Sequence, residues 1–165
     1  MNQGQFRNRA SFGKRQEYVV ISELLKQGFD VYIPLVDDQQ IDCIVRRGEN
    51  DYIDIQIKAR SKDCLLFDAG RFAAMNIPNP RDNYYFIFYS EQADCYWVFP
   101  SLKLVELASQ NKKGKNIGKY HINLTGDLPP KKESSYNVSR IGHKGGIDGQ
   151  ENLHFGANHQ QAKGS

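Results

Sequence analysis

Two carboxylates, one amide and one lysine in the sequence have the residue types of a site for a divalent metal ion. These residues are Glu17, Asp42, Gln56 and Lys58. Carboxylate and amide oxygens are ligands of hard cations such as Mg2+. Gln56 and Lys58 are separated by one apolar residue, so on an extended strand both side chains point to the same face. A metal ion held by the oxygens would then lie beside a positive charge.

Gln56 and Lys58 belong to a segment, residues 52–60, in which apolar and polar residues alternate. This alternation is typical of a β-strand with one apolar face and one polar face. A second β-forming run occupies residues 41–45, and turn-forming residues 48–51 lie between the two runs, which predicts a β-hairpin. An edge strand with a solvated polar face shows the same alternation, so the strand alone does not establish a site.

A helix is predicted over residues 11–27 and is expected to end at Gly28. Its apolar side chains recur at spacings of three and four and are Tyr18, Val20, Ile21, Leu24 and Leu25. Glu17 falls inside this apolar stripe, whereas Glu23 and Lys26 fall on the opposite side. A carboxylate turned toward a core costs roughly several kcal/mol unless it is paired or binds a cation. The alternative is a glutamate that the helix dipole favours near the N-terminus.

These four residues would converge if the helix packed across the polar side of the hairpin. A helical Glu, an Asp on one strand and a ligand-x-Lys pair on the next resemble the PD-(D/E)XK nuclease superfamily. The segments that carry the resemblance are GKRQEYVVISELLKQGFDVYIP, IDCIV and YIDIQIKARS. They are most similar to the Gln-x-Lys branch, which includes intron-encoded homing endonucleases, and are more distantly similar to Holliday junction resolvases. Two residues depart from the motif, because Ile41 stands in place of its Pro and Gln56 in place of its usual Glu.

The resemblance covers residues 13–60 well and the later strands loosely. It implies an α/β fold of the restriction-endonuclease type, with a mixed central β-sheet flanked by helices. The implied activity is Mg2+-dependent endonucleolytic hydrolysis of DNA, site-specific as in homing or restriction enzymes, with Mn2+ able to replace Mg2+. Asp42, Gln56 and Glu17 would be the metal ligands, and Lys58 would complete the catalytic residues.

The implied partner is double-stranded DNA. A homodimer or a higher homo-oligomer would match the two-fold symmetry of a duplex that is cut on both strands. The net charge of +3 is compatible with a polyanionic partner but does not establish one. The basic residues expected to contact phosphates are Arg7, Arg9, Lys14, Arg15, Lys112, Lys113, Lys115 and Lys119. A frayed terminus and a solvated loop are the alternatives for these segments.

Several other residues are weaker candidates for metal binding, catalysis or base stacking. Asp37 and Asp38 lie in a polar loop as rival metal ligands, and Asp54 on the polar strand face is expected to be solvated. The histidines match no zinc-site or catalytic-triad spacing and are His121, His143, His154 and His159. Aromatic residues at positions 84–89 and at Trp97 could stack on bases, but an aromatic run of this length is more typical of a core.

The cysteines indicate a reducing compartment. Cys43, Cys64 and Cys95 include no closely spaced pair, and Cys43 falls on the apolar face of its strand. An odd number of cysteines without a disulfide pattern predicts free thiols in a cytoplasmic protein. The sequence contains no secretory signal and no apolar run of membrane-spanning length.

The remaining elements complete an α/β pattern. Strands are expected at 29–35, 84–89, 95–100 and, as an edge strand, 120–124, with a second helix at 102–108 capped by Ser101. Less clear segments are 64–67, which would extend the sheet, and 70–76, which would form one helical turn. The predicted organisation is a basic arm at 1–10, a nuclease-like domain at 11–128 and a polar tail at 129–165.

Three other functions remain open at this point. The same fold could bind DNA without cleaving it, which the replacement of Glu by Gln56 makes plausible. It could instead be a nuclease for Holliday junctions or other structured nucleic acids, RNA included. A purely structural domain would require Glu17 to face solvent.

Overall fold

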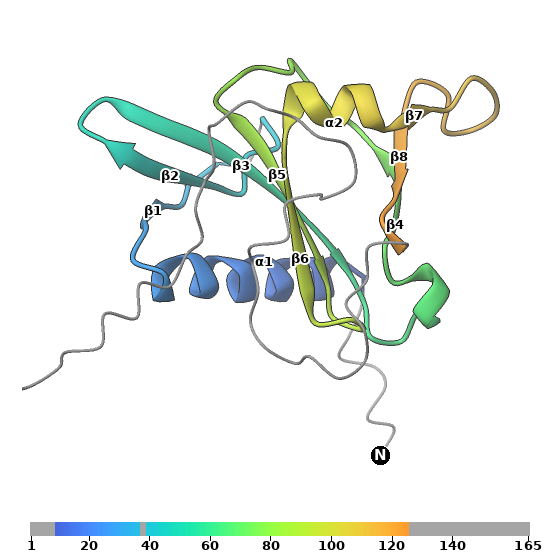
Figure 1. Ribbon diagram of the computed structural model, residues 1–165, viewed down its shortest axis with the longest axis horizontal. Helices are drawn as coiled ribbons and strands as arrows, with labels where there is room; N and C mark the ends of the chain where they lie inside the picture. The colour runs from blue at the N-terminus through green and yellow to red at the C-terminus, as the bar shows by residue number, and fades with distance from the viewer. Residues whose placement is uncertain (1–8, 37–38, 126–165) are drawn as a thin grey trace, which may run out of the picture.

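The computed structural model describes residues 9–36 and 39–125, which form one mixed α/β unit (Figure 1). The elements in chain order are α1 (Arg9–Lys26), β1 (Asp30–Tyr32), β2 (Cys43–Gly48), β3 (Asp51–Arg60), the 3-10 helix η1 (Leu66–Asp68), β4 (Arg71–Met75), β5 (Tyr84–Ser90), β6 (Cys95–Pro100), α2 (Ser101–Leu107), β7 (Ser109–Gln110) and β8 (Tyr120–Asn123). A five-stranded sheet has the order β1-β2-β3-β5-β6, and a three-stranded sheet has the order β4-β8-β7. Because β3 and β5 pair in parallel and the other pairs are antiparallel, the main sheet is mixed, as predicted.

Helix α1 begins at Arg9, two residues before the predicted start, and ends at Lys26, just before the glycine predicted to stop it. Gly28 has φ +85°, a left-handed conformation that favours glycine. The Gly28 amide donates to the Leu25 carbonyl at 3.0 Å and the Phe29 amide donates to the Leu24 carbonyl at 3.2 Å. This pair of hydrogen bonds is a Schellman motif, and it turns the chain directly into β1.

The condition for convergence of the four residues is not met, because α1 covers the apolar face of the hairpin and not its polar face. Val20, Ile21 and Leu24 of α1 share a core with the apolar face of β3, whose residues are Ile53, Ile55 and Ile57. Burying these two apolar surfaces against each other is the favourable arrangement. The side chains of Gln56 and Lys58, which alternate with the isoleucines, therefore lie on the opposite face of the sheet from α1.

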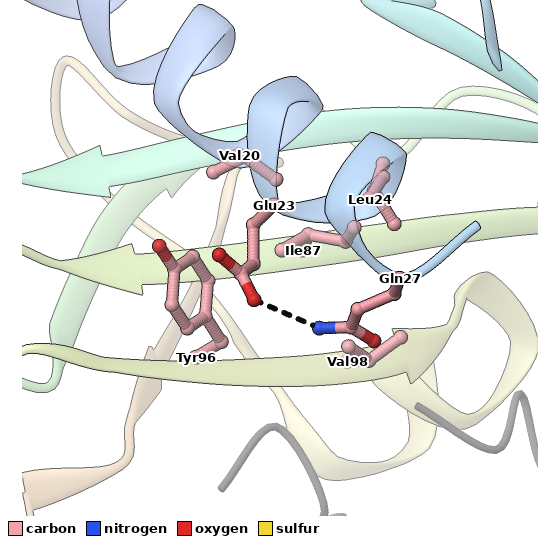
Figure 2. A pocket seen from close by; sticks show the side chains of 7 residues that line it. All are labelled: Val20, Glu23, Leu24, Gln27, Ile87, Tyr96 and Val98. Carbon is pink, nitrogen blue, oxygen red and sulfur yellow. Dashed lines mark hydrogen bonds between the residues drawn. The ribbon is translucent and has the colours of Figure 1, made fainter. Parts of the chain in front are cut away.

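The limits of the apolar stripe of α1 also differ from the prediction. Tyr18 and Leu25 are each 54% exposed, so they lie outside the buried face. Glu23, predicted to face solvent, has a side chain that is only 16% exposed. It accepts a hydrogen bond of 3.1 Å from Gln27, and both side chains lie over β5 and β6 beside Tyr96 (Figure 2). The cavity there measures about 10 Å³, which is room for no more than one water molecule.

The second face of the main sheet carries a separate core. Tyr84, Phe86 and Phe88 of β5 pack there with Leu104 of α2 and with residues of β4, β6 and β8. The alternate residues of β5 belong to the α1 core, so every residue of β5 is buried. This confirms the strand predicted at 84–89, which lies inside the sheet and pairs with β6, and it assigns the aromatic run to the core.

Several predicted elements differ in the structure. The strand expected at 29–35 is limited to β1, residues 64–67 contribute to η1 and form no strand, and residues 71–75 form β4 and no helical turn. Strand β8 lies between β4 and β7, so it is not an edge strand. Ser101 is the first residue of α2 and not its cap; its hydroxyl contacts both backbone groups of Arg81. Leu104 of this helix is buried, whereas Leu107 is 52% exposed.

Two predicted segments lie almost wholly outside the described residues, namely the arm at 1–10 and the tail at 129–165. Cys43, Cys64 and Cys95 are free thiols, as predicted, and Cys43 is fully buried. None of the helices in the described part of the chain has the length and apolar character needed to cross a membrane.

Candidate active site

Asp42 lies at the point where β2 begins and is bound to the neighbouring strand by both its backbone and its side chain. Its amide donates to the carbonyl of Ile55 at 2.8 Å. Its carboxylate oxygen Oδ2 accepts a hydrogen bond of 2.6 Å from the amide of Ile57. Ile57 is the residue between Gln56 and Lys58, so the Asp42 carboxylate lies against the backbone of the predicted Gln-x-Lys pair.

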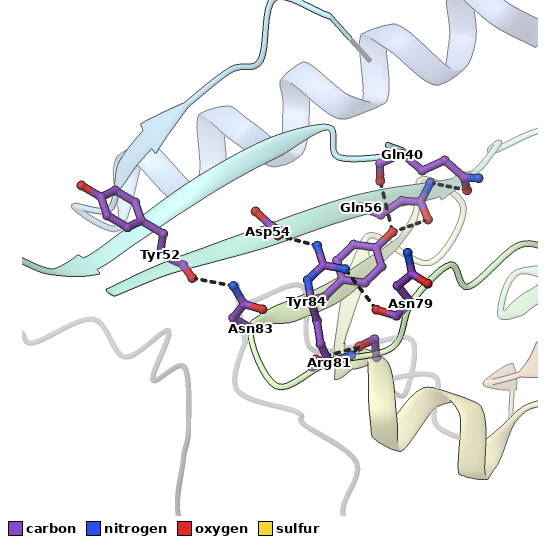
Figure 3. A network of polar contacts seen from close by, with 9 residues as sticks. Gln40, Tyr52, Asp54, Gln56, Asn79, Arg81, Asn83 and Tyr84 are labelled. Carbon is purple, nitrogen blue, oxygen red and sulfur yellow. Dashed lines mark hydrogen bonds and ion pairs between the residues drawn. The ribbon is translucent and has the colours of Figure 1, made fainter. Parts of the chain in front are cut away.

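Gln56 is buried and both ends of its amide are engaged (Figure 3). Its Nε2 donates to Oε1 of Gln40 at 3.2 Å. Its Oε1 accepts from the hydroxyl of Tyr84, also at 3.2 Å. The same hydroxyl lies 3.2 Å from the backbone carbonyl oxygen of Gln40. The orientation of the Gln56 amide is thus fixed by two residues from different segments.

Lys58 follows Gln56 on the same face of β3. The register pairs Gln56 with Phe86 and Lys58 with Phe88, and both phenylalanines belong to the core on the face away from α1. The lysine itself is half-buried. The spacing and the face expected for a ligand-x-Lys pair are therefore present.

Glu17 lies on the α1 side of the sheet, with a side chain that is 20% exposed. Its Oε2 lies 2.7 Å from Nζ of Lys14. A hydrogen bond to Glu17 is the main cause that raises the pKa of Lys14, and the charge of Asp42 adds to it. Burial raises the pKa of the Cys43 thiol to about 12, with further contributions from the charges of Asp42 and Glu17. Both carboxylates therefore act on the same small region at the start of β2.

Asp54 is not solvated as predicted. Its side chain is 18% exposed and forms an ion pair of 2.5 Å with Arg81. The Arg81 guanidinium lies over the ring of Tyr84 at 4.6 Å from its centroid and also donates to the carbonyl of Asn79 at 3.0 Å. Gln40, Arg81 and Tyr84 are the residues of this region that the sequence did not indicate, because their contacts to β3 span 16 to 28 residues of sequence.

Comparison with known protein families shows to which family the chain is related. The model of the PD-(D/E)XK endonuclease family matches residues 8–121, more than half of the chain. The chain belongs to the PD-(D/E)XK endonuclease family. The match spans α1, the hairpin with Asp42, Gln56 and Lys58, and the later strands, so the predicted resemblance and fold class are confirmed.

Solved structures similar to this PD-(D/E)XK endonuclease are also nucleases. A bacterial homing endonuclease has 19% identity and a TM-score of 0.49, covering 79% of this chain and 84% of its own. A Holliday junction resolvase from the archaeon Archaeoglobus fulgidus has 17% identity and a TM-score of 0.47, covering 68% and 84%. A nuclease from a fusselovirus has 17% identity and a TM-score of 0.44, covering 73% and 90%. Comparison with curated protein sequences gave no significant match.

The donors of this endonuclease fit a hard divalent cation in their chemistry. Asp42, Gln56 and Glu17 offer only oxygen atoms, the ligands that Mg2+ and Mn2+ prefer. Among residues 9–36 and 39–125, no three His, Cys, Asp or Glu side chains are grouped as a metal site. A ligand set among the described residues therefore includes a group of another type, such as the amide of Gln56. The rival ligands Asp37 and Asp38 fall outside the described residues.

The basic residues predicted to contact DNA occupy two regions. Lys14 and Arg15 are exposed on α1, where Arg15 donates to the hydroxyl of Ser11 at 3.3 Å. Lys112, Lys113 and Lys115 are exposed, and Lys119 is half-buried, in the loop that joins β7 to β8 (Figure 1). Arg7 is outside the described residues, and Arg9 is the first residue of α1. His121 is exposed, and the other three histidines lie in the undescribed C-terminal segment.

Proposed function

We propose that this PD-(D/E)XK endonuclease is a Mg2+-dependent enzyme that hydrolyses phosphodiester bonds in double-stranded DNA at specific sites, as homing or restriction enzymes do. The observation that supports this most strongly is the hydrogen bond of 2.6 Å between the Asp42 carboxylate and the Ile57 amide. It joins the expected acidic ligand to the Gln-x-Lys segment of the next strand. Such a bond holds the carboxylate in one position beside the Gln-x-Lys pair, and a carboxylate oxygen is a ligand that a hard cation prefers.

In this proposal, Asp42 and Gln56 hold the cation and Lys58 acts on the attacking water. Glu17 adds negative charge from the α1 side, next to Asp42 at the start of β2. When bound, a divalent cation polarises a phosphate oxygen and lowers the pKa of a water molecule. Lys58 orients the water toward phosphorus and offsets the negative charge that develops there. The attacking water gives a proton to solvent and forms the new P–O bond, the opposite P–O ester bond breaks, and the leaving oxygen takes a proton from solvent.

DNA affinity in this proposal comes from the exposed basic residues. The β7–β8 loop and the first half of α1 would contact phosphates, which set affinity and orientation but not sequence preference. A homodimer or a higher homo-oligomer would present two sites to the two strands of a duplex. A cytoplasmic location agrees with the three free thiols.

The function is tested by nicking of supercoiled plasmid with Mg2+, Mn2+ or EDTA, together with a library of target sequences in case the site is rare. We expect cutting that requires metal and that is lost in Lys58→Ala. The exposed Lys62 is the matched control, because Lys62→Ala removes the same charge from the segment just after β3. Metal-independent retention of duplex DNA without any cutting would instead support a DNA-binding module on this fold.

A further inference from the structure

The buried amide of Gln56 both donates and accepts a hydrogen bond. Gln56 is 3% exposed and donates through Nε2 to the oxygen Oε1 of Gln40. On the other side, Oε1 accepts from the Tyr84 hydroxyl. Because both ends of the amide have a partner, a neutral amide is well accommodated at the position where the family motif usually has Glu.

The Tyr84 contact leaves the Gln56 oxygen with acceptor capacity. An amide oxygen has two lone-pair directions, and the Tyr84 hydroxyl has a single hydrogen. That hydrogen lies between two acceptors at 3.2 Å, the Gln40 carbonyl oxygen and Gln56 Oε1. At least one lone pair of Oε1 is thus left for a cation, and its direction is set by the contacts on both sides of the amide.

Tyr84 is held by its neighbours, so its position is well defined. It is fully buried, and its ring centroid lies 5.1 Å from that of Phe86. The guanidinium of Arg81 lies over the ring and is bound in turn by Asp54 (Figure 3). Loss of the hydroxyl alone would leave this packing in place.

Gln40 connects the same cluster to the segment that carries Asp42. Its backbone has φ +58°, a left-handed conformation that is uncommon for a residue other than glycine, two positions before Asp42. Its carbonyl oxygen contacts Tyr84 and its side chain contacts Gln56. Through Gln40, the Tyr84 hydroxyl therefore links the two expected ligands, Asp42 and Gln56, across the edge of the β2–β3 pair.

We propose that Tyr84 and Gln40 are positioning residues that aim the Gln56 oxygen at the metal ion and fix its distance from Asp42. This inference rests on the proposed function, because it assigns Gln56 to the metal site. Neither residue touches substrate in this account. Their role is to orient a ligand, and loss of such a partner typically lowers metal affinity or activity by about 10–100-fold.

The test compares Tyr84→Phe with Tyr89→Phe in the full-length protein. Tyr89 lies on the same strand and is also buried, but it belongs to the core on the α1 side and stacks on Tyr96. Mn2+ binding is measured by titration calorimetry, and cleavage is measured as a function of Mg2+ concentration. For Tyr84→Phe we expect the Mn2+ Kd and the half-maximal Mg2+ concentration to rise about 10-fold or more. For Tyr89→Phe we expect both values to stay within twofold.

An NMR measurement provides a readout that needs no metal. The side-chain amide of Gln56, identified by its loss in Gln56→Ala, should shift in the spectrum of Tyr84→Phe and of Gln40→Leu but not in that of Tyr89→Phe. If Tyr84→Phe lowers the Tm more than Tyr89→Phe does, the effect on Mn2+ affinity is measured in Gln40→Leu instead. Unchanged Mn2+ affinity and an unchanged Gln56 signal in both variants would overturn the positioning role. A wild-type protein that neither binds Mn2+ nor cuts DNA would instead overturn the proposed function.

Discussion

The Asp54–Arg81 ion pair should stabilise the protein more than an exposed pair of similar length. The side chains of Arg81 and Asp54 are 37% and 18% exposed, and the atoms are 2.5 Å apart. Exposed pairs contribute roughly 0.2–1 kcal/mol, whereas close, well-desolvated charge pairs show coupling energies from about 1.5 kcal/mol upward. Partial burial places the expected coupling energy of Asp54–Arg81 at about 1–2 kcal/mol.

A double-mutant cycle isolates this coupling from the stacking of Arg81 on Tyr84. The free energy of unfolding is measured in urea for the wild type, Asp54→Ala, Arg81→Ala and the double variant. Lys103–Glu106 on α2 is the matched control, because its atoms are 2.6 Å apart but its side chains are 34% and 64% exposed. We expect about 0.5 kcal/mol or less for this control. Equal coupling energies for the two pairs would refute the reasoning that burial of Asp54 strengthens its ion pair.

Three further predictions follow from the backbone, the thiols and the basic loop. Gly28→Ala should destabilise the protein by about 1–2 kcal/mol because of its left-handed φ of +85°. Gly13 lies within α1, and no atom is close to the position of an added Cβ, so Gly13→Ala should stabilise the protein by up to about 1 kcal/mol. Chemical denaturation measures both changes, and an unchanged free energy of unfolding in Gly28→Ala would contradict the Schellman assignment. Burial raises the pKa of Cys43 to about 12, so unfolded thiols lose protons near pH 9 while this folded thiol keeps its own. Because the unfolded state then binds fewer protons, the free energy of unfolding should fall as the pH rises from about 9 toward 12, and Cys43→Ala should flatten this slope; a wild-type profile that is level above pH 9 would disprove the effect. Replacing the exposed lysines of the β7–β8 loop, Lys112, Lys113 and Lys115, by alanine should reduce the salt dependence of DNA binding. The slope of log K against log salt concentration, measured by fluorescence anisotropy, should fall in magnitude by up to about 0.9 for each lost phosphate contact. An unchanged slope would show that this loop does not contact DNA.

The alternation of residues in the sequence was sufficient to predict the hairpin and the central strand, because those patterns depend on local burial. Every residue of β5 is buried, as its continuous apolar character requires. Convergence of the four site residues required α1 to pack across the polar face of the hairpin, and the sequence could not show whether it does. In the structure, the apolar surfaces of the helix and of β3 meet, and the Asp42 carboxylate reaches Ile57 at the edge of the strand pair.

Residues 64–76 show why short segments were assigned incorrectly. Leu65, Leu66 and Phe67 are an apolar run of strand length, yet all three are exposed around η1. Strand β4 has two alanines and little local preference for an extended conformation, and it forms because it pairs with β8, which begins 45 residues after β4 ends. Pairing across such a distance leaves no local signal in the sequence.

The polar cluster around Gln56 could not be predicted from the sequence either. Gln40 is distant in the sequence from Arg81 and Tyr84, and the pairing of β3 with β5 brings the three residues to Gln56 and Asp54. Tyr84 was interpreted as a core residue, which is correct for its ring, but its hydroxyl makes the contact to Gln56. A single sequence indicates which residues are apolar, but not which polar atom of a buried aromatic residue finds a partner.

The measurement that tests the central claim most directly is the rate of Mg2+-dependent DNA cleavage by Asp42→Asn. This substitution keeps the shape of the side chain and removes its charge, and Asp54→Asn makes the same change on the same strand pair at a residue bound to Arg81. We predict that Asp42→Asn lowers the cleavage rate by more than about 100-fold while DNA is still bound, and that Asp54→Asn stays within about 10-fold of the wild type. Cleavage by Asp42→Asn at the wild-type rate would contradict the assignment of this site.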